Sequence, residues 1–346
     1  MNGVLIIDKP GGLTSHDVVN RVRRILRERS VGHLGTLDPM ATGVLPLVIG
    51  NLTRLAQFYT KAEKVYEGAI RFGFSTDTYD AEGKAVGMPQ DVEVHREEIE
   101  ALAAHFRGVI EQTPPPFSAK KIHGVPAYKL ARKEKEVALK PVQVEIKEFE
   151  IVAAEGNCAR FRARVASGTY LRSVAHDMGQ RLGFGAHLSS LRRTAVAEFT
   201  LADAHTLAEV AEAAVRMTRN NRDTGPEGTP DNSPPALLVG NGGQNEVCPG
   251  GTPEPLHSFF IHPRKLLPDF PSVTVDDLTA ARIRSGRAIN LPDLSRARQV
   301  KVFAGQKNLL AIATRIAGTL FHPKIVLCGG ADTPLDKLGA GFVRRP

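Results

Sequence analysis

A long polar stretch in the second half of the chain limits how this sequence can fold. Residues 219–255 are dense in Gly, Pro, Asn and Asp. A segment of this composition cannot bury enough apolar surface to offset the entropy that ordering would cost. We therefore expect two folded units, over residues 1–216 and 258–346, joined by a flexible insertion or linker over residues 217–257.

In the first unit, strand-like and helix-like patterns alternate irregularly. Leu171, Val174 and Met178 lie on one apolar stripe of a helix that should end at Gly183. Such a mixture favours an α+β fold over a repeating βαβ order. We expect strands over residues 3–8, 65–73, 142–152 and 159–166, and helices that start at a Thr14–Asp17 capping box, run through 99–106 to a stop at Gly108, and cover 171–182 and 203–216.

The second unit reads as a small β-rich module. Residues 275–286 predict a short helix with a glycine stop, and residues 300–304, 309–316 and 324–328 predict strands.

The chain is basic, with 45 Lys and Arg against 37 Asp and Glu, a net charge of +8 and a pI of about 9.5. That charge suits a polyanionic partner, although general solubility would also account for it. Two segments concentrate the positive charge, and each could be a solvated surface or an RNA contact. They are Arg21, Arg23, Arg24, Arg27 and Arg29, and the run of Lys120, Lys121, Lys129, Arg132, Lys133 and Lys135 around Tyr128.

The three cysteines, Cys158, Cys248 and Cys328, lie far apart and match neither a disulfide framework nor a metal site. This spacing suits a reducing cytosol. We expect a cytoplasmic protein without a membrane anchor, because no signal peptide opens the chain and no apolar run approaches the length of a membrane span. The sequence contains no phosphate-binding loop or dinucleotide fingerprint, so it signals neither a metal nor a cofactor.

Residues 32–46 (GHLGTLDPMATGVLP) place one carboxylate, Asp38, in a turn crowded with Gly, Thr and Pro. Pro39 fixes its own φ and disfavours the helical region for Asp38. A rigid loop that holds a single acid suggests a nucleophile or general base presented to a substrate. The alternative is an Asx-turn, in which the Asp38 side chain bonds nearby backbone.

This loop resembles the catalytic loop of the TruB family of tRNA pseudouridine synthases. Further segments resemble blocks of that family in the expected order, so the similarity covers roughly residues 1–212 and continues more weakly after residue 258. The family usually has a much shorter connection where residues 219–255 stand. The segments are KVYEGAIRFGFSTDTYDAEG (64–83), PPPFSAKKIHGVPAYKLAR (114–132), SGTYLRSVAHDMG (167–179) and AHLSSLRRTAVAEF (186–199).

The resemblance implies a pseudouridine-synthase fold, with a mixed, mainly antiparallel sheet flanked by helices and a small C-terminal β-barrel-like PUA domain that binds RNA. It also implies an isomerase that flips a uridine out of the T stem-loop of tRNA, at position 55, and converts it to pseudouridine. That reaction breaks the N-glycosidic bond, turns the uracil and joins C5 to the ribose. The stand-alone bacterial type of this family implies no cofactor, guide RNA or protein partner.

The resemblance assigns roles to individual residues. Asp38 matches the catalytic aspartate, which would attack either uracil C6 or ribose C1′, and Arg172 matches its partner arginine. Tyr170 matches a second active-site tyrosine that helps to remove the C5 proton. The substrate-binding residues implied are His33 beside the flipped base, Tyr66 stacked on it, Leu191 in the apolar wall, and Lys120 and Lys121 on phosphates. Asp77 and Asp80 match a block whose acids order a loop.

Each of these residues also has an ordinary structural explanation. Tyr66, Tyr170 and Leu191 could be core residues, Arg172 a surface arginine on a helix, and His33 a turn histidine. Three other functions remain open: a guide-RNA-dependent synthase, a non-catalytic RNA-binding protein, and a nucleoside glycosidase. Glycosidases usually use two acids that straddle the bond, and the sequence offers only one well-placed acid.

Overall fold

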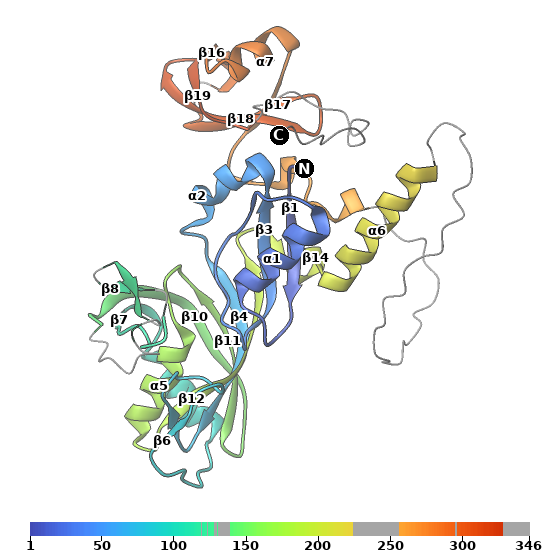
Figure 1. Cartoon of the computed structure of the whole chain (residues 1–346). Helices are drawn as coiled ribbons and strands as arrows, with labels where there is room; N and C mark the ends of the chain where they lie inside the picture. Colours follow the sequence, from blue (N-terminus) through green and yellow to red (C-terminus); the bar gives the residue numbers. More distant parts are fainter. Residues whose placement is uncertain are drawn as a thin grey trace, which may run out of the picture.

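The computed structural model describes residues 1–118, 120–122, 124–127, 130, 139–223, 256–294 and 296–327. In these residues the chain has an α+β fold, as the sequence predicts (Figure 1). Most of the predicted linker lies outside the described residues. So do Tyr128, Lys129, Arg132, Lys133 and Lys135 of the basic run, together with Cys248 and Cys328.

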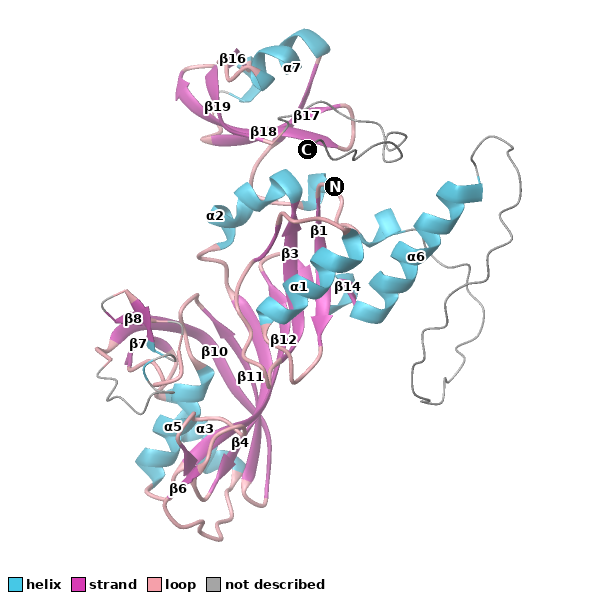
Figure 2. Cartoon of the chain, viewed as in Figure 1, coloured by secondary structure: helices cyan, strands magenta, loops and turns pink. Residues whose placement is uncertain are grey.

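A large mixed sheet forms the centre of the first part of the chain (Figure 2). Its strands are β1 (Gly3–Lys9), β2 (Val31–His33), β3 (Thr42–Ile49), β4 (Lys64–Phe72), β7 (Gly108–Gln112), β10 (Val142–Glu155), β11 (Cys158–Val165), β12 (Ala186–Val196), β13 (Phe199–Thr200) and β14 (Ala204–His205). The main path runs β14–β1–β3–β12–β4–β11–β10–β7, and β2 and β13 pair with β3 and β12.

Most neighbours in this sheet are antiparallel. Only the pairs β1–β14 and β3–β12 are parallel along the main path of the described strands. The prediction of a mixed, mainly antiparallel sheet is therefore confirmed. Two small hairpins lie beside it, β5 (Ser75–Thr76) with β6 (Ala85–Val86), and β8 (Lys121–Ile122) with β9 (Val125–Pro126).

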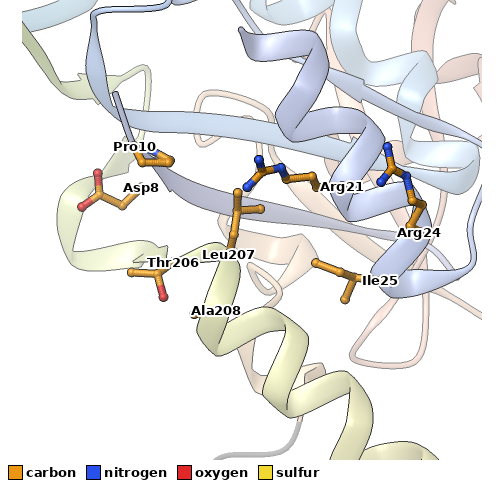
Figure 3. A pocket seen from close by; sticks show the side chains of 8 residues that line it. All are labelled: Asp8, Pro10, Arg21, Arg24, Ile25, Thr206, Leu207 and Ala208. Carbon is orange, nitrogen blue, oxygen red and sulfur yellow. The ribbon is translucent and has the colours of Figure 1, made fainter. Parts of the chain in front are cut away.

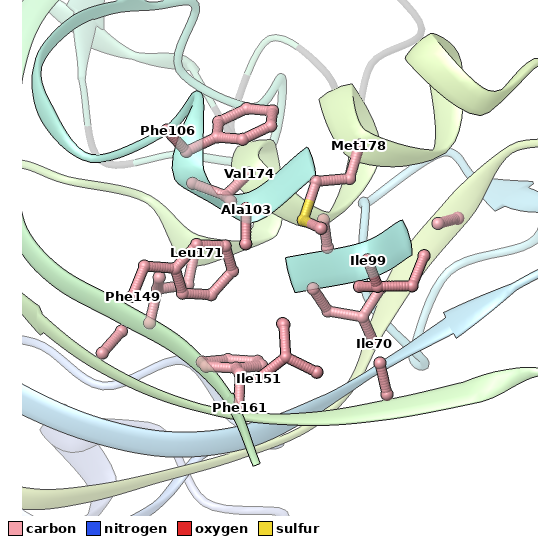
Figure 4. Packing of buried hydrophobic residues seen from close by; sticks show 14 of the residues in the cluster. Ile70, Ile99, Ala103, Phe106, Phe149, Ile151, Phe161, Leu171, Val174 and Met178 are labelled. Atoms are coloured by element: carbon pink, nitrogen blue, oxygen red, sulfur yellow. The ribbon is translucent and has the colours of Figure 1, made fainter. Parts of the chain in front are cut away.

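Helices cover this sheet in two groups. On the β1–β3 half, α1 (Ser15–Leu26) contacts α6 (Leu207–Asp223), and their apolar residues share one core. On the other half, α3 (Arg96–Ala104) packs on β10 and α5 (Leu171–Leu182) on β12. Figure 4 shows Phe149 and Phe161 of the sheet facing Leu171, Val174 and Met178 of α5. The site described below lies between these two halves.

Capping residues explain several helix ends. Thr14 and Asp17 form the predicted capping box of α1, and Gly183 ends α5 with a left-handed φ of 85°. Several boundaries differ from the prediction by a few residues, and two of the differences concern helix ends. α3 ends at Ala104, and Gly108 starts β7 instead of stopping a helix. α6 continues to Asp223, into the stretch predicted as a linker, because an established helix extends at low cost.

The C-terminal described residues form a separate five-stranded sheet in the order β15–β17–β18–β19–β16, with α7 (Asp277–Arg284) packed on it. The strands are β15 (Ser272–Val275), β16 (Ile289–Asn290), β17 (Gln299–Ala304), β18 (Asn308–Ala317) and β19 (Leu320–Val326). The small β-rich module predicted from the sequence is thus present. Two short α-helical or 3₁₀ turns, η1 (Gly50–Leu55) and α2 (Ala56–Tyr59), lie between the sheets.

One apolar cluster joins the two sheets. It contains Leu52 and Leu55 from the first part of the chain and Phe303 and Leu309 from the second. A polar contact accompanies it. Tyr59 donates from Oη to Glu198 Oε1 at 2.6 Å, and the Leu267 N–H donates to the same oxygen at 2.9 Å. The sequence did not predict this shared core.

Candidate active site

Asp38 lies in the loop that joins β2 to β3, where the Ala41 N–H donates to the Asp38 carbonyl at 3.1 Å and closes a turn. Its carboxylate faces a guanidinium. Arg172 Nη2 donates to Asp38 Oδ1 at 3.1 Å, and Arg172 Nε lies 2.9 Å from Oδ2. The side chain therefore makes a two-point ion pair with a residue 134 positions away, unlike the local Asx-turn considered as the alternative.

Arg172 occupies the first turn of α5 and its side chain is 5% exposed. A buried guanidinium needs acceptors for all its N–H groups. Nη1 donates to the Thr78 carbonyl and Nη2 to the Phe117 carbonyl, each at 3.1 Å. A second carboxylate, Asp80, lies 3.3 Å from Nη1 and is equally buried. Arg172 is therefore fixed by backbone and by two acids, and it has little freedom to leave Asp38.

The electrostatic balance at Asp38 has three main contributions. Burial raises the pKa of the Asp38 carboxyl, the Arg172 guanidinium opposes that rise, and the negative Asp80 adds to it. The net direction is upward. Because the Asp38 side chain remains 35% exposed, one side of the carboxylate is open to an incoming group. The arrangement thus presents an aspartate that is more basic than usual and is held in a fixed orientation.

Two buried side chains hold the loop from the β1 side. Lys9, at the end of β1, is fully buried, and its Nζ donates to the carbonyls of Pro39 at 3.0 Å, Ala41 at 2.7 Å and Pro10 at 2.9 Å. Burial lowers the pKa of Lys9 to about 8. Ser15 Oγ accepts from the Leu37 N–H at 2.8 Å. Backbone on both sides of Asp38 is therefore fixed from one direction.

Arg193 of β12 holds the loop from the opposite direction. It is 1% exposed, and its guanidinium donates to the carbonyls of Val44 at 2.8 Å, Gly35 at 3.0 Å and Thr36 at 3.3 Å. Gly43 permits this close approach: it has a φ of 100°, and a Cβ there would lie 2.2 Å from the Arg193 carbonyl oxygen. Only glycine fits such a position without strain.

Tyr170, the N-cap residue of α5, lies next to Arg172 in the chain, and Gln112 fixes its backbone. The buried Gln112 accepts from the Tyr170 N–H at 2.8 Å and donates to its carbonyl at 3.0 Å. Burial raises the pKa of the Tyr170 phenol, while the Ser118 hydroxyl and Arg172 act in the opposite direction. Asp38 and Arg172 are thus in direct contact, and Tyr170 lies two residues before Arg172 in the chain.

Tyr66 and Leu191 lie on the neighbouring strands β4 and β12. Both are partly buried, and each packs against both apolar clusters of the large sheet. Tyr66 is in register with Arg193, the residue that binds the loop at Gly35. The two side chains thus occupy the seam between the halves of the sheet, close to the loop that carries Asp38.

His33, Lys120 and Lys121 are the remaining site residues predicted from the sequence. His33 ends β2 and is half-buried. Burial and the nearby Arg193 lower the pKa of the His33 imidazole, and its Nδ1 has no hydrogen-bond partner in the described part of the chain. Lys120 is exposed, and Lys121 lies in β8, where only its backbone is described. No contact between Lys120 and Asp38 is found in the described part of the chain.

Four residues of this site were not identified from the sequence as site residues: Lys9, Gln112, Arg193 and the ion-pairing Asp80. A Lys-Pro pair directly after a buried strand and an Arg-Arg pair inside the AHLSSLRRTAVAEF segment are local signals that could have suggested two of them. No three His, Cys, Asp or Glu side chains among the described residues gather as a metal site. None of the helices described there is long and apolar enough to cross a membrane.

Comparisons with known proteins identify the family. Residues 23–171 match the model of the TruB family pseudouridylate synthase N-terminal domain. Residues 172–227 match the tRNA pseudouridylate synthase B C-terminal domain. The boundary between these matches falls between Leu171 and Arg172, inside the first turn of α5.

Curated relatives extend the match to nearly the whole chain. The tRNA pseudouridine synthase B of Solibacter usitatus is 46% identical over 94% of this chain and all of the relative. The protein of the same name from Bacillus cytotoxicus is 39% identical over 94% of both chains.

The fold is also similar to a solved structure of an H/ACA RNP bound to a substrate RNA containing 2′-deoxyuridine. The TM-score is 0.64 at 22% identity, over 94% of this chain and 85% of the other. Lys9 and Arg193 hold the loop that carries Asp38, the partner arginine of Asp38 lies on α5, and the relatives that match nearly the whole chain share one name. The chain therefore belongs to the TruB family of pseudouridylate synthases.

Proposed function

We propose that this enzyme converts uridine to pseudouridine in the T loop of tRNA, at position 55. The observation that carries the proposal is the partly exposed Asp38 carboxylate on the buried Arg172 fork. The names of the full-length relatives support tRNA as the substrate. Position 55 follows from the resemblance of the catalytic loop to that of the family.

Asp38 acts as the nucleophile in this proposal, at uracil C6 or ribose C1′. The N1–C1′ bond breaks, the uracil turns, C5 bonds to C1′, and the bond formed to Asp38 breaks, which regenerates the free carboxylate. The proton on C5 is then lost and N1 gains one, so the reaction is an isomerisation that needs no cofactor. The attacking oxygen must be ionised, and Arg172 favours that form. The upward pull of burial on the Asp38 pKa makes the ionised oxygen a better nucleophile than a surface carboxylate.

The target uridine must leave its stack before Asp38 can reach it, at a cost of a few kcal/mol. Tyr66 stacks on the extruded base, which returns about 1–3 kcal/mol. Leu191 forms the apolar wall beside it, and His33 occupies the space next to the flipped base as a neutral imidazole. Tyr170, held by Gln112 near Asp38 and Arg172, helps to remove the C5 proton.

Residues 1–216 supply the chemistry in this scheme, and residues 258–346 form a PUA-like RNA-binding domain after the insertion at 217–257. Lys120 and Lys121 contact phosphates. The enzyme acts in the cytoplasm without a guide RNA or a protein partner, as its resemblance to the stand-alone bacterial type implies, and the names of the full-length relatives support this.

Incubation of the purified protein with an unmodified tRNA transcript tests the proposal. We expect pseudouridine at position 55, mapped by chemical sequencing, in the absence of any other macromolecule. Asp38→Asn keeps the shape of the side chain but not its charge, so it should bind tRNA and form no product. Binding without conversion by the wild-type protein would identify a non-catalytic RNA-binding protein. Pseudouridine formation by Asp38→Asn would remove the nucleophile role.

A further inference from the structure

A cavity of about 580 Å³ lies beside α1, and Asp38 is not among its lining residues (Figure 3). Arg21 and Arg24 of α1 form one wall, and Thr206 and Leu207, at the start of α6, form the opposite one. A neighbouring hollow of about 370 Å³ is lined by Arg23, Arg24, Arg27, Glu28 and Arg29. We name these four exposed arginines, Arg21, Arg24, Arg27 and Arg29, the α1 arginine surface.

These arginines do not stabilise the fold in the way that Arg23 does. Arg23 is half-buried, and it donates to the Val31 carbonyl at 2.8 Å and to Asn20 Oδ1 at 3.3 Å. Arg21 and Arg24 are exposed and form no ion pair with a described residue. Arg21 lies four positions after Asp17, and Arg24 lies in the last turn of α1, where a cation suits the helix dipole, so both add a little to helix stability; their guanidinium groups nevertheless remain exposed.

The acids around this surface are already engaged with other partners. Asp8 lines the larger cavity, but its carboxylate lies 2.8 Å from Arg192 Nη2. Asp17 caps α1 through Thr14, Glu28 pairs with the chain's N-terminal ammonium at 3.0 Å, Glu209 accepts from the Thr206 N–H at 2.7 Å, and Glu212 pairs with Arg216 at 3.2 Å. The α1 arginine surface therefore keeps its positive charge for an external anion.

The larger cavity is connected to the catalytic loop through Lys9. Pro10 lines the cavity, and its carbonyl accepts from the same Lys9 Nζ that binds the Pro39 carbonyl next to Asp38. One wall of the cavity is thus tied to the backbone beside Asp38. Guanidinium groups suit phosphates because their planar fork can bind two oxygens at once.

We propose that the α1 arginine surface binds the phosphate backbone of the substrate tRNA. This inference rests on the proposed function for the identity of the RNA. The occupant is a polyanion because five arginines, four of them exposed, line two adjoining hollows, and the two acids in their linings, Asp8 and Glu28, already pair with other cations. The contacts supply affinity independent of base sequence, in addition to the interactions at the flipped uridine.

Tests of this surface compare two double variants that remove the same charge. Arg21→Gln with Arg24→Gln removes two residues of the surface. Arg107→Gln with Arg216→Gln removes two exposed arginines that are paired with Glu100 and Glu212. Binding of wild-type protein and both variants to tRNA is measured by filter binding over a series of salt concentrations, and pseudouridine formation is measured at saturating tRNA.

Each lost phosphate contact should make the slope of log K against log salt less steep by about 0.7–0.9. We therefore expect the surface variant to lose about 1.4–1.8 of slope and several-fold in affinity at low salt, with an unchanged kcat at saturating tRNA. The paired-arginine variant should keep the wild-type slope. Equal slopes and affinities for both variants and the wild type would overturn the proposal.

Arg21→Lys with Arg24→Lys separates charge from packing. It retains both positive charges, so the wild-type slope should return if phosphates are the partners. A slope that stays low in the lysine variant would contradict a phosphate contact. Failure of the wild-type protein to form pseudouridine would reject the proposed function while leaving the salt slopes interpretable, so the two failures are distinguishable.

Discussion

Asp80 is the residue that most alters the view of the site obtained from the sequence. From its block alone it was expected to order a loop, and the structure places it 3.3 Å from the same guanidinium that binds Asp38. One cation is thus shared by two acids, one buried and one partly exposed. The buried acid fixes the arginine, and the exposed one remains available to the substrate.

Asp80→Asn should change the pH dependence of the reaction as well as its rate. The negative Asp80 raises the pKa of Asp38, so its removal lowers that pKa and keeps Asp38 ionised to lower pH. We expect the acid limb of a single-turnover pH–rate profile to move to lower pH, while kcat falls by up to about 100-fold because Arg172 is less well positioned. Asp77→Asn is the matched control, since no ion pair of Asp77 is described. An acid limb that stays in place would show that Asp80 does not act on Asp38.

Lys9 should make stability depend on pH in the alkaline range. Burial lowers its pKa from 10.5 to about 8, so between these values the unfolded chain binds more protons than the folded one. The free energy of unfolding of the wild type should therefore rise from pH 8 to pH 10.5 relative to Lys9→Met. Urea denaturation of both proteins at several pH values measures this difference. A constant difference would mean that Lys9 titrates normally.

Residue types in the loop pointed to Asp38, whereas Tyr170 and Arg172 were predicted from the resemblance to the TruB family; the structure places Arg172 on Asp38. Lys9 and Arg193 were missed because they act on backbone carbonyls 32 and 149 positions away. Every residue has a backbone carbonyl, so the sequence does not show which carbonyls accept hydrogen bonds from a distant side chain. The contacts of Lys9 and Arg193 can therefore be identified only in the folded chain.

At the level of elements, the hairpin segment around residues 76–83 is held against α5 by an aromatic stack. Tyr79 and His176 have ring centroids 3.8 Å apart and an interplanar angle of 10°. Tyr79 has a φ of 65°, which is unfavourable for a bulky residue. Its neighbours Thr78 and Asp80 both contact Arg172. The stack therefore stabilises a strained turn that orients the arginine.

Loss of this stack should reduce turnover more than substrate binding. For Tyr79→Ala, kcat is expected to fall by up to about tenfold with little change in KM, because an aromatic pair is worth about 0.5–1.5 kcal/mol. His176→Phe keeps a ring at the same position and should retain a kcat close to that of the wild type. If both variants lose kcat equally, the imidazole rather than ring stacking is what matters.

Most elements could be predicted from apolar periodicity, as for α5, whose stripe and glycine stop were both identified. Boundaries were less predictable where one residue type serves two purposes. Gly108 has a left-handed φ of 85°, which suits a helix end and a strand entry equally. Polar and apolar residues do not alternate clearly along β12, because Arg193 is buried and binds carbonyls while Ser190 is exposed.

At the level of the whole molecule, the C-terminal sheet shares an apolar core with the first part of the chain. Leu52 and Leu55 pack with Phe303 and Leu309 in one cluster. This shared core could not be predicted, because the polar stretch suggested independent units. The sequence also does not show which apolar side chains of the two parts pack together.

A chain that ends at residue 255 should therefore be destabilised as well as weakened in tRNA binding. Exposure of two buried leucines costs at least about 3 kcal/mol, and urea denaturation followed by circular dichroism measures it. The full-length Tyr59→Phe variant loses the hydrogen bond to Glu198 and the one that the phenol oxygen accepts from the Leu267 N–H at 3.2 Å, and it should cost about 1 kcal/mol because that N–H still donates to Glu198. Equal stability of the truncated and complete chains would mean that the shared cluster contributes nothing, and equal tRNA affinity would contradict RNA binding by the C-terminal part.

The position of β12 has a consequence for how the protein is made. β3 and β4 follow one another in the chain, yet β12 lies between them in the sheet. A nascent polypeptide leaves the ribosome N-terminus first, so its two half-sheets stay unjoined, with open edges, until residues 186–196 emerge. Arg193 is synthesised as part of this strand, and the enzyme should consequently remain inactive until residues 186–196 have emerged.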